Sequence, residues 1–167
     1  MITFLLLTTC GLAAVWDVRF RKIPNWLTIP ALLAAIALHL ASGTLSPSLY
    51  GLALALGLGL PLFALRGLGG GDVKLMAAAG AIVGWPGFVA LFAIQAVLGG
   101  GAAVVLLLWK GGLRSAMRNV LHILGSLLRL RAPYKDRRDL DVGSPGAVTL
   151  PQAPVMAAAA VIYLVAK

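Results

Sequence analysis

The chain has 167 residues, of which 60% are hydrophobic and 11% are charged, with a mean hydropathy of +0.97 and a formal net charge of +9. A soluble domain is usually about half apolar and about a quarter charged, so this composition excludes a sizeable soluble domain and indicates a polytopic membrane protein. The single cysteine, Cys10, excludes a disulfide framework and a CxxC metal site, and the two histidines lie far apart without Cys or Glu companions, so we expect neither a metal nor a cofactor.

The sequence contains six apolar runs. A helix needs roughly 20 residues to cross a bilayer, and the length of each run is compared with that number. The runs cover residues 2–16, 26–41, 49–65, 73–84, 88–109 and 151–166. The first run lacks the basic segment of a signal peptide, and we interpret it as a membrane helix. The short fourth run ends at the turn sequence GWPG, residues 84–87. We therefore expect an all-α membrane protein with six transmembrane helices in one domain, residues 1–167.

The basic residues lie in alternate loops between these runs. All of the 14 lysines and arginines except Lys167 follow the first run, surround the start of the fourth, or follow the fifth. Under the positive-inside rule these segments face the cytoplasm, so both termini lie outside. The net charge of +9 is therefore explained by the orientation of the chain in the membrane. Because no basic face is separate from the membrane, we expect no nucleic-acid partner.

The segment 111–133 has a different pattern. Its apolar residues fall at helical spacing on one side, and arginines occupy much of the remainder. This pattern predicts a basic amphipathic helix that lies on the anionic cytoplasmic surface in contact with lipid. The polar stretch behind it completes a cytoplasmic segment of about residues 111–149 and holds three acids that sit among basic residues: Asp136, Asp139 and Asp141.

The remaining two acids, Asp17 and Asp72, each lie beside an apolar run on the expected cytoplasmic side. Taken singly, each has a structural interpretation. Asp72, behind the glycines 69–71, fits a helix N-cap, and Asp17 fits a loop acid balanced by Arg19 and Arg21. Taken together, two lone acids at one membrane edge form a pair with a chemical use, provided that the fold lets them meet.

That use is aspartic-type hydrolysis. Two close carboxylates share a proton, because both cannot ionise comfortably. The ionised one takes a proton from a water that attacks a peptide carbonyl, and the protonated one binds the carbonyl oxygen and protonates the leaving amine. The glycines 69–71 let an extended substrate approach Asp72. Helix dipoles favour Asp72, at a helix N-terminus, as the base and Asp17, at a C-terminus, as the acid.

Two stretches around these acids resemble the motifs of the type IV prepilin peptidases. GGGDVKL, residues 69–75, matches the G-x-G-D motif of that family, and DVRFRKIPNWLT, residues 17–28, resembles its other motif. The interval between the aspartates and the six-helix layout agree as well, so the resemblance covers nearly the whole chain.

The resemblance implies a membrane aspartyl endopeptidase of the bacterial inner membrane. Such an enzyme removes the basic N-terminal leader of type IV or Flp-type prepilins at the cytoplasmic face. Asp17 and Asp72 correspond to the catalytic pair. The other motif positions, expected to bind substrate or shape the loops, are Gly69, Gly71, Pro24, Asn25 and Lys74. Lys74 is also expected to face the acidic residue that such prepilins carry a few places past the cut.

Larger members of that family carry a zinc-binding domain with paired CxxC motifs and also methylate the new N-terminus. With one cysteine, this chain is similar to the short forms that serve tight-adherence pili. Two alternatives stay open: a small transporter or assembly scaffold that uses Asp17 and Asp72 to bind an ion or proton, and a protease that cuts ordinary membrane helices. The sequence leaves open the identity of the prepilin, the methylation, the oligomeric state and the contact between the two aspartates at rest.

Overall fold

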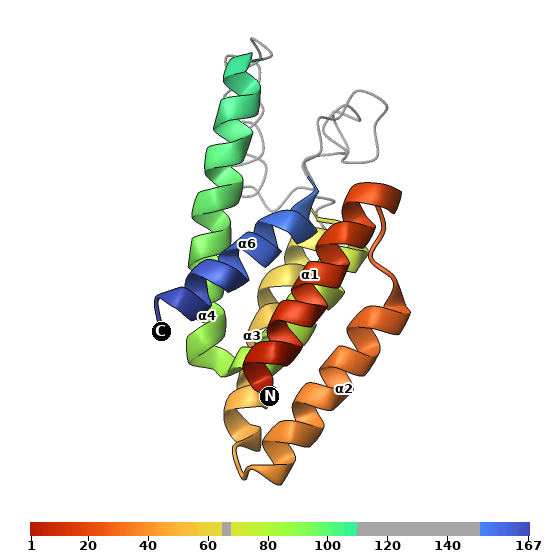
Figure 1. The fold of residues 1–167 in the computed structure, drawn as a ribbon, viewed down its shortest axis with the longest axis vertical. Coiled ribbons are helices and arrows are strands. Elements are labelled where there is room, and N and C mark those ends of the chain that lie inside the picture. The colour runs from red at the N-terminus through yellow and green to blue at the C-terminus, as the bar shows by residue number, and fades with distance from the viewer. Residues whose placement is uncertain (65–67, 110–150) are drawn as a thin grey trace.

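The structure, a computed structural model, describes residues 1–64, 68–109 and 151–167. This part of the chain forms helices joined by short loops, in the order α1 (Ile2–Phe20), α2 (Asn25–Ala41), α3 (Leu45–Ala64), α4 (Gly70–Trp109) and α6 (Gln152–Val165) (Figure 1). The described residues contain no strand, so the predicted all-α class is confirmed. The amphipathic helix and loop predicted for residues 111–149 lie outside the described residues.

Helix α4 turns back at Gly84, the first residue of the predicted GWPG turn. Gly84 has φ 72° and ψ 173°, a conformation that favours glycine, and the residues after it run back past those before it (Figure 1). Two residues on, Pro86 has no N–H to offer to the carbonyl of Ile82. The sequence therefore located this break correctly, and α4 consists of a first arm, residues 70–83, and a second arm, residues 85–109.

Side chains from two other helices satisfy carbonyls beside this break. His39 of α2 uses Nε2 to donate to the carbonyl oxygen of Ile82 at 3.0 Å, while its Nδ1 lies 2.8 Å from the Thr44 hydroxyl. Ser48 of α3 donates to the carbonyl oxygen of Ala81 at 2.7 Å. Both are buried, so the turn in α4 is fixed by hydrogen bonds that a lipid environment would not supply.

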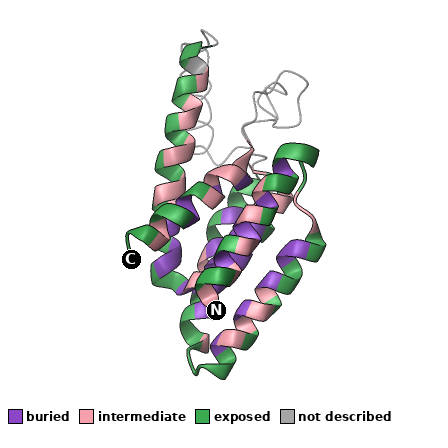
Figure 2. Cartoon of the chain, viewed as in Figure 1, coloured by how far each residue is buried: buried purple, intermediate pink, exposed green. Residues whose placement is uncertain are grey.

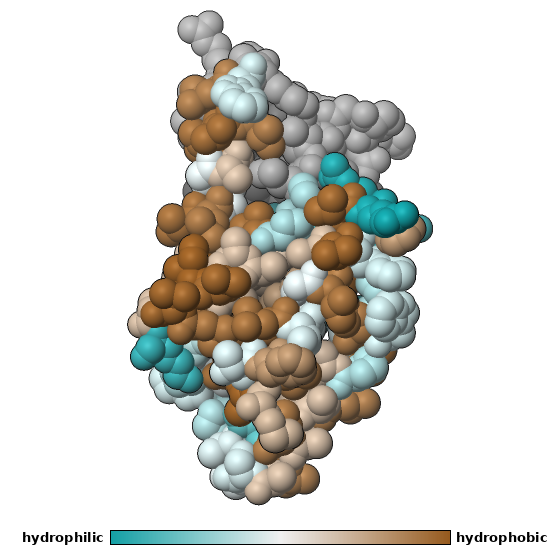
Figure 3. All heavy atoms as spheres, in the orientation of Figure 1, coloured by the Kyte–Doolittle hydropathy of each residue, from teal (hydrophilic) through white to brown (hydrophobic). Residues whose placement is uncertain are grey.

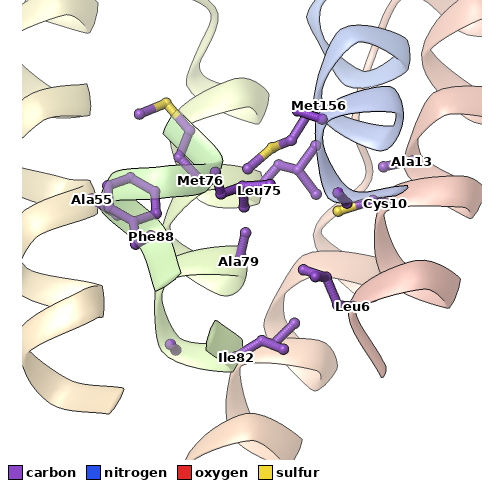
Figure 4. Close-up of a cluster of buried hydrophobic side chains, with 14 of the residues drawn as sticks. Leu6, Cys10, Ala13, Ala55, Leu75, Met76, Ala79, Ile82, Phe88 and Met156 are labelled. Carbon is purple, nitrogen blue, oxygen red and sulfur yellow. The ribbon is translucent and has the colours of Figure 1, made fainter. Parts of the chain in front are cut away.

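The first arm of α4 is the centre of the bundle. Helix α4 as a whole contacts α1, α2, α3 and α6, and in its first arm nearly all residues from Val73 to Ile82 are buried. Figure 4 shows this packing, with Leu75, Met76, Ala79 and Ile82 between residues of α1, α3 and α6. A helix that is apolar on every side can be surrounded in this way, and the small residues of AAAGA (residues 77–81) allow neighbours to approach closely.

The closest approach is between α3 and the first arm of α4. A methyl group on Gly51 would collide with the backbone at Gly80 and Gly84, and one on Gly80 would collide with the backbone of Gly51. Gly59 packs in the same way against Val73, whose Cγ1 would lie 3.0 Å from an added methyl group. These contacts hold the N-terminal part of α4, where Asp72 lies, against the C-terminal part of α3.

The outer surface suits lipid. Large apolar side chains point outward on several helices, among them Phe4 at 73% exposure and Val97 at 75%, and no described side chain of residues 93–109 is buried (Figure 2). Apolar atoms spread over much of the face in Figure 3, and hydrophilic atoms gather at the end of α1 and beside the C-terminus. Soluble monomers rarely expose such continuous apolar surface, so the chain is a membrane protein.

Three of the helices, α1, α3 and α4, are long and apolar enough to cross a membrane. Helices α2 and α6, with 17 and 14 residues, are shorter. At 1.5 Å per residue, α6 is about 21 Å long, less than the roughly 30 Å of a bilayer core. Helical segments occur at all six predicted runs, but their number as membrane spans stays a prediction.

Candidate active site

Asp17 lies in the last turn of α1, which continues past the predicted end at residue 16. The helix ends at Arg21, whose backbone is left-handed with φ 53° and whose N–H donates to the carbonyl oxygen of Asp17 at 2.8 Å. The Asp17 side chain is only 7% exposed. Its Oδ2 accepts a hydrogen bond from the backbone N–H of Ala153 at 3.3 Å. Asp17 is therefore held between the end of α1 and the start of α6.

Asp72 lies in the first turn of α4, which begins at Gly70, three residues before the predicted start. Its Oδ2 accepts a hydrogen bond from the backbone N–H of Gly69 at 3.2 Å, and the carbonyl oxygen of Gly69 accepts from the N–H of Asp72 at 3.1 Å. The bond from the Gly69 N–H to the Asp72 carboxylate is one half of a capping box, with Gly69 as the cap and the acid three residues later; a glycine cap has no side chain to supply the other half. The N-cap interpretation of Asp72 is therefore wrong by three positions, although the acid does stabilise the helix start.

The glycines before Asp72 are required by close contacts on two sides. A methyl group on Gly69 would lie 3.0 Å from Asp72 Oδ2, and one on Gly71 would lie 3.0 Å from Ile23 Cβ. At Gly70, the variable position of the motif, the nearest atom would be in the Phe63 ring at 3.4 Å, an ordinary contact. The absence of a side chain at Gly69 thus lets the Asp72 carboxylate fold back over the start of α4. Its absence at Gly71 lets the loop after α1 pack closely against that helix.

One pocket of about 320 Å³ brings the two aspartates together. Its wall consists of the two aspartates, the first three residues of the α1–α2 loop and the motif glycines: Asp17, Arg21, Lys22, Ile23, Gly69, Gly70, Gly71 and Asp72. The two carboxylates are close enough to interact electrostatically. Among the described residues, no three His, Cys, Asp or Glu side chains lie close enough to hold a metal ion. The arrangement can therefore position a water or a carbonyl group between two acids.

A hydrogen bond joins two of the predicted motif residues across 49 positions. Lys74 Nζ donates to Asn25 Oδ1 at 2.8 Å. Asn25 is the first residue of α2, and Pro24 is the residue that caps that helix, with an extended backbone. Lys74 lies outside the wall of the aspartate pocket, and its partner within the described structure is this amide rather than either aspartate. The bond ties the loop that bears Ile23 to the first arm of α4.

Sequence reasoning assigned no role to the start of α6, which contributes the Ala153 amide to Asp17. A backbone amide leaves no side-chain signal, so only the fold could reveal it. The same contact changes the argument from helix dipoles, because Asp17 lies at the N-terminus of α6 as well as at the C-terminus of α1. Helix ends alone therefore do not decide which aspartate is the base.

The comparison with protein families agrees with this geometry. A model described as the type IV leader peptidase family matches residues 4–104, more than half of the chain. The chain belongs to the type IV leader peptidase family. The matched part of this leader peptidase contains both aspartates, the glycines between them and the Asn25–Lys74 hydrogen bond, whereas Ala153 lies beyond it. No curated protein and no solved structure gives a significant match.

Proposed function

We propose that this leader peptidase is a membrane aspartyl endopeptidase that removes the basic leader of type IV or Flp-type prepilins. The observation that carries the proposal is the pocket shared by Asp17 and Asp72, two acids 55 positions apart that the fold places in one wall. Family membership supplies the reaction class, and the pocket supplies a pair of carboxylates suited to it.

The reaction follows from two carboxyl groups that hold one proton between them. The ionised group accepts a proton from water as the water oxygen bonds to the carbonyl carbon of the peptide. The other group donates a hydrogen bond to the carbonyl oxygen, which takes up negative charge. Collapse of the tetrahedral intermediate breaks the C–N bond, and a carboxyl proton passes to the leaving amine.

The surroundings of the acids support this chemistry. Within the part of the chain that the structure describes, a backbone N–H holds one oxygen of each carboxylate, Ala153 for Asp17 and Gly69 for Asp72. The pocket wall near Asp72 is glycine backbone, so an extended peptide can approach the acid without side chains in the way. Arg21 and Lys22 also line this pocket.

The proposed setting is the bacterial inner membrane, with the pocket toward the cytoplasm and both termini outside. It derives from the distribution of basic residues and from the family. In Figure 1 both chain termini lie away from the end of α1 and the start of α6, an arrangement that fits this topology. The partner would be a prepilin-like protein, and lipid would surround the apolar helices.

The test is incubation of membranes that contain the enzyme with a tagged prepilin-like protein, followed by electrophoresis. The proposal predicts a shift to lower mass that Asp17→Asn and Asp72→Asn each abolish and that Asp139→Asn, a change at an acid outside both motifs, leaves unchanged. A transporter or scaffold that uses the two acids for ions predicts no shift with any variant. Cleavage within the apolar segment instead of before it would indicate a protease of ordinary membrane helices.

A further inference from the structure

Two contacts join the α1–α2 loop, residues 21–24, to the N-terminal part of α4. Ile23 lies so close to Gly71 that a methyl group added there would be 3.0 Å from Ile23 Cβ. Directly after the loop, Asn25 Oδ1 accepts the hydrogen bond from Lys74 Nζ at 2.8 Å. The first contact limits how near the loop can come to α4, and the second limits how far it can move away. Together they set the width of the space between the loop and α4.

The backbone of Lys74 is fixed by the core of the bundle. Its two neighbours in α4, Val73 and Leu75, are buried, whereas the side chain of Lys74 is exposed and reaches Asn25. Lys74 also follows Asp72 by two residues in the same helix. The hydrogen bond therefore fixes Asn25, and with it the loop that precedes Asn25, relative to Asp72.

The surroundings of Lys74 bear on the expectation that it faces an acidic residue of the substrate. Lys74 is not among the residues that line the pocket of Asp17 and Asp72, where the cationic residues are Arg21 and Lys22. Its ammonium group has an amide oxygen of this chain as a partner. These two observations place Lys74 outside the space in which a peptide would be cleaved.

We infer that Lys74 and Asn25 are positioning residues, whose hydrogen bond holds the α1–α2 loop at the distance from α4 at which Asp17 and Asp72 share one pocket. The inference rests on the proposed function and gives Lys74 a role that acts through the loop in place of substrate recognition. Reacting groups need to be held to within about 0.5 Å of their productive geometry. A loop that moves away from α4 therefore slows the chemical step more than it weakens substrate binding.

Lys74→Met and Asn25→Ala test the bond from its two sides, since one removes the donor and the other the acceptor. Each should lower kcat for a prepilin-like protein about threefold and leave KM unchanged. The double variant should be no slower than the slower single one, because both changes remove the same bond. Lys167→Met is the control, because it removes the same charge from the exposed C-terminal residue, and it should leave both constants unchanged.

Asn25→Asp distinguishes positioning from substrate recognition. It keeps the acceptor and adds a charge, which strengthens the bond to Lys74 and also suits the first turn of α2. Positioning predicts kcat and KM close to the native values. If Lys74 instead bound a carboxylate of the substrate, the added carboxylate would compete with it, and KM would rise.

A second substrate gives an independent readout of the same question. In it, the acidic residues near the cut of the prepilin-like protein are replaced by their amides. The threefold loss in Lys74→Met should be the same for this substrate as for its parent. A raised KM in Asn25→Asp, or a loss in Lys74→Met that disappears with the amide substrate, would overturn the inference.

Hydrogen exchange in the absence of substrate separates this inference from the proposed function, because it requires no cleavage. The amides of Arg21 and Leu27 are hydrogen-bonded at the two ends of the loop. They should exchange about two to five times faster in Lys74→Met than in the native enzyme, and at native rates in Asn25→Asp and Lys167→Met. Faster exchange without any cleavage by the native enzyme would support the positioning of the loop and contradict the protease. Equal exchange in Lys74→Met and the native enzyme would overturn the positioning role and leave cleavage by the aspartates intact.

Discussion

Gly71 offers the sharpest test of how the aspartate pocket is built. In Gly71→Ala the new methyl carbon would lie 3.0 Å from Ile23 Cβ and 3.4 Å from the Ile23 backbone nitrogen. Carbon atoms in contact prefer about 3.5–4.0 Å, so the α1–α2 loop must move away from α4 by about 0.5–1 Å. Asp17 precedes that loop and Asp72 follows Gly71, so the shift widens the pocket between them.

The consequence can be estimated. A misplacement of about 1 Å in a reacting group can cost about 100-fold in rate, and we therefore expect Gly71→Ala to lower kcat by about 10- to 100-fold. Gly70→Ala is the matched control, because its methyl carbon would meet the Phe63 ring at 3.4 Å. Both changes replace a glycine in the first helical turn with alanine, which favours the helix by about 0.5–1 kcal/mol.

The assay is the rate of leader removal from a purified prepilin-like protein in detergent micelles, with thermal unfolding of each variant as a measure of stability. Gly71→Ala should be folded and slow, and Gly70→Ala should be folded and close to native in rate. Equal rates for the two variants would refute the reasoning that the Ile23 contact sets the spacing of the aspartates.

Three further predictions concern the elements that support the site. Lys74→Met and Asn25→Ala should each reduce the free energy of unfolding, because each removes the hydrogen bond between these two side chains. A double-mutant cycle should give a coupling energy of about 0.5–1 kcal/mol. Additive effects of the two changes would contradict the hydrogen bond. Gly80→Ala should destabilise the protein by about 3 kcal/mol in chemical unfolding, because its methyl carbon would lie 2.9 Å from the Gly51 carbonyl carbon. Gly57→Ala is the control and should not destabilise the protein, because its methyl carbon would meet no atom within 4 Å. His39→Ala should lower the free energy of unfolding by about 1–3 kcal/mol, because the Ile82 carbonyl loses its donor. The cleavage rate of the folded enzyme should stay unchanged, and a stable but inactive variant would contradict this prediction.

The features that sequence predicted well are those that depend on local chemistry. The turn at residues 84–87 followed from glycine and proline, and the motif glycines 69 and 71 proved to be the positions where a methyl group meets a close neighbour. Helix ends were less accurate. Helix α1 continues through polar residues to Phe20, and α3 begins at Leu45, four residues early, because helices extend past their apolar stretch until a cap or turn stops them.

Contacts between distant segments could not be read from the chain. The amide of Ala153 on Asp17, the Lys74–Asn25 bond and the two side chains that satisfy the broken part of α4 all depend on which helices become neighbours. Hydrophobic runs establish that helices form but not how they are arranged, since nearly any apolar face can pack against another. The meeting of the two aspartates was accordingly an expectation from the charge-based topology, which puts both on the cytoplasmic side, and the shared pocket supports it.

The measurement that bears most directly on the central claim compares Asp17→Asn, Asp72→Asn and the double variant in the same cleavage assay, with thermal unfolding to establish that each is folded. If the two carboxylates act as one unit, each single change should lower kcat by at least about 100-fold, and the double change should be no worse than the more damaging single one. Losses that multiply in the double variant, or near-native cleavage with either acid replaced, would contradict a shared catalytic pair.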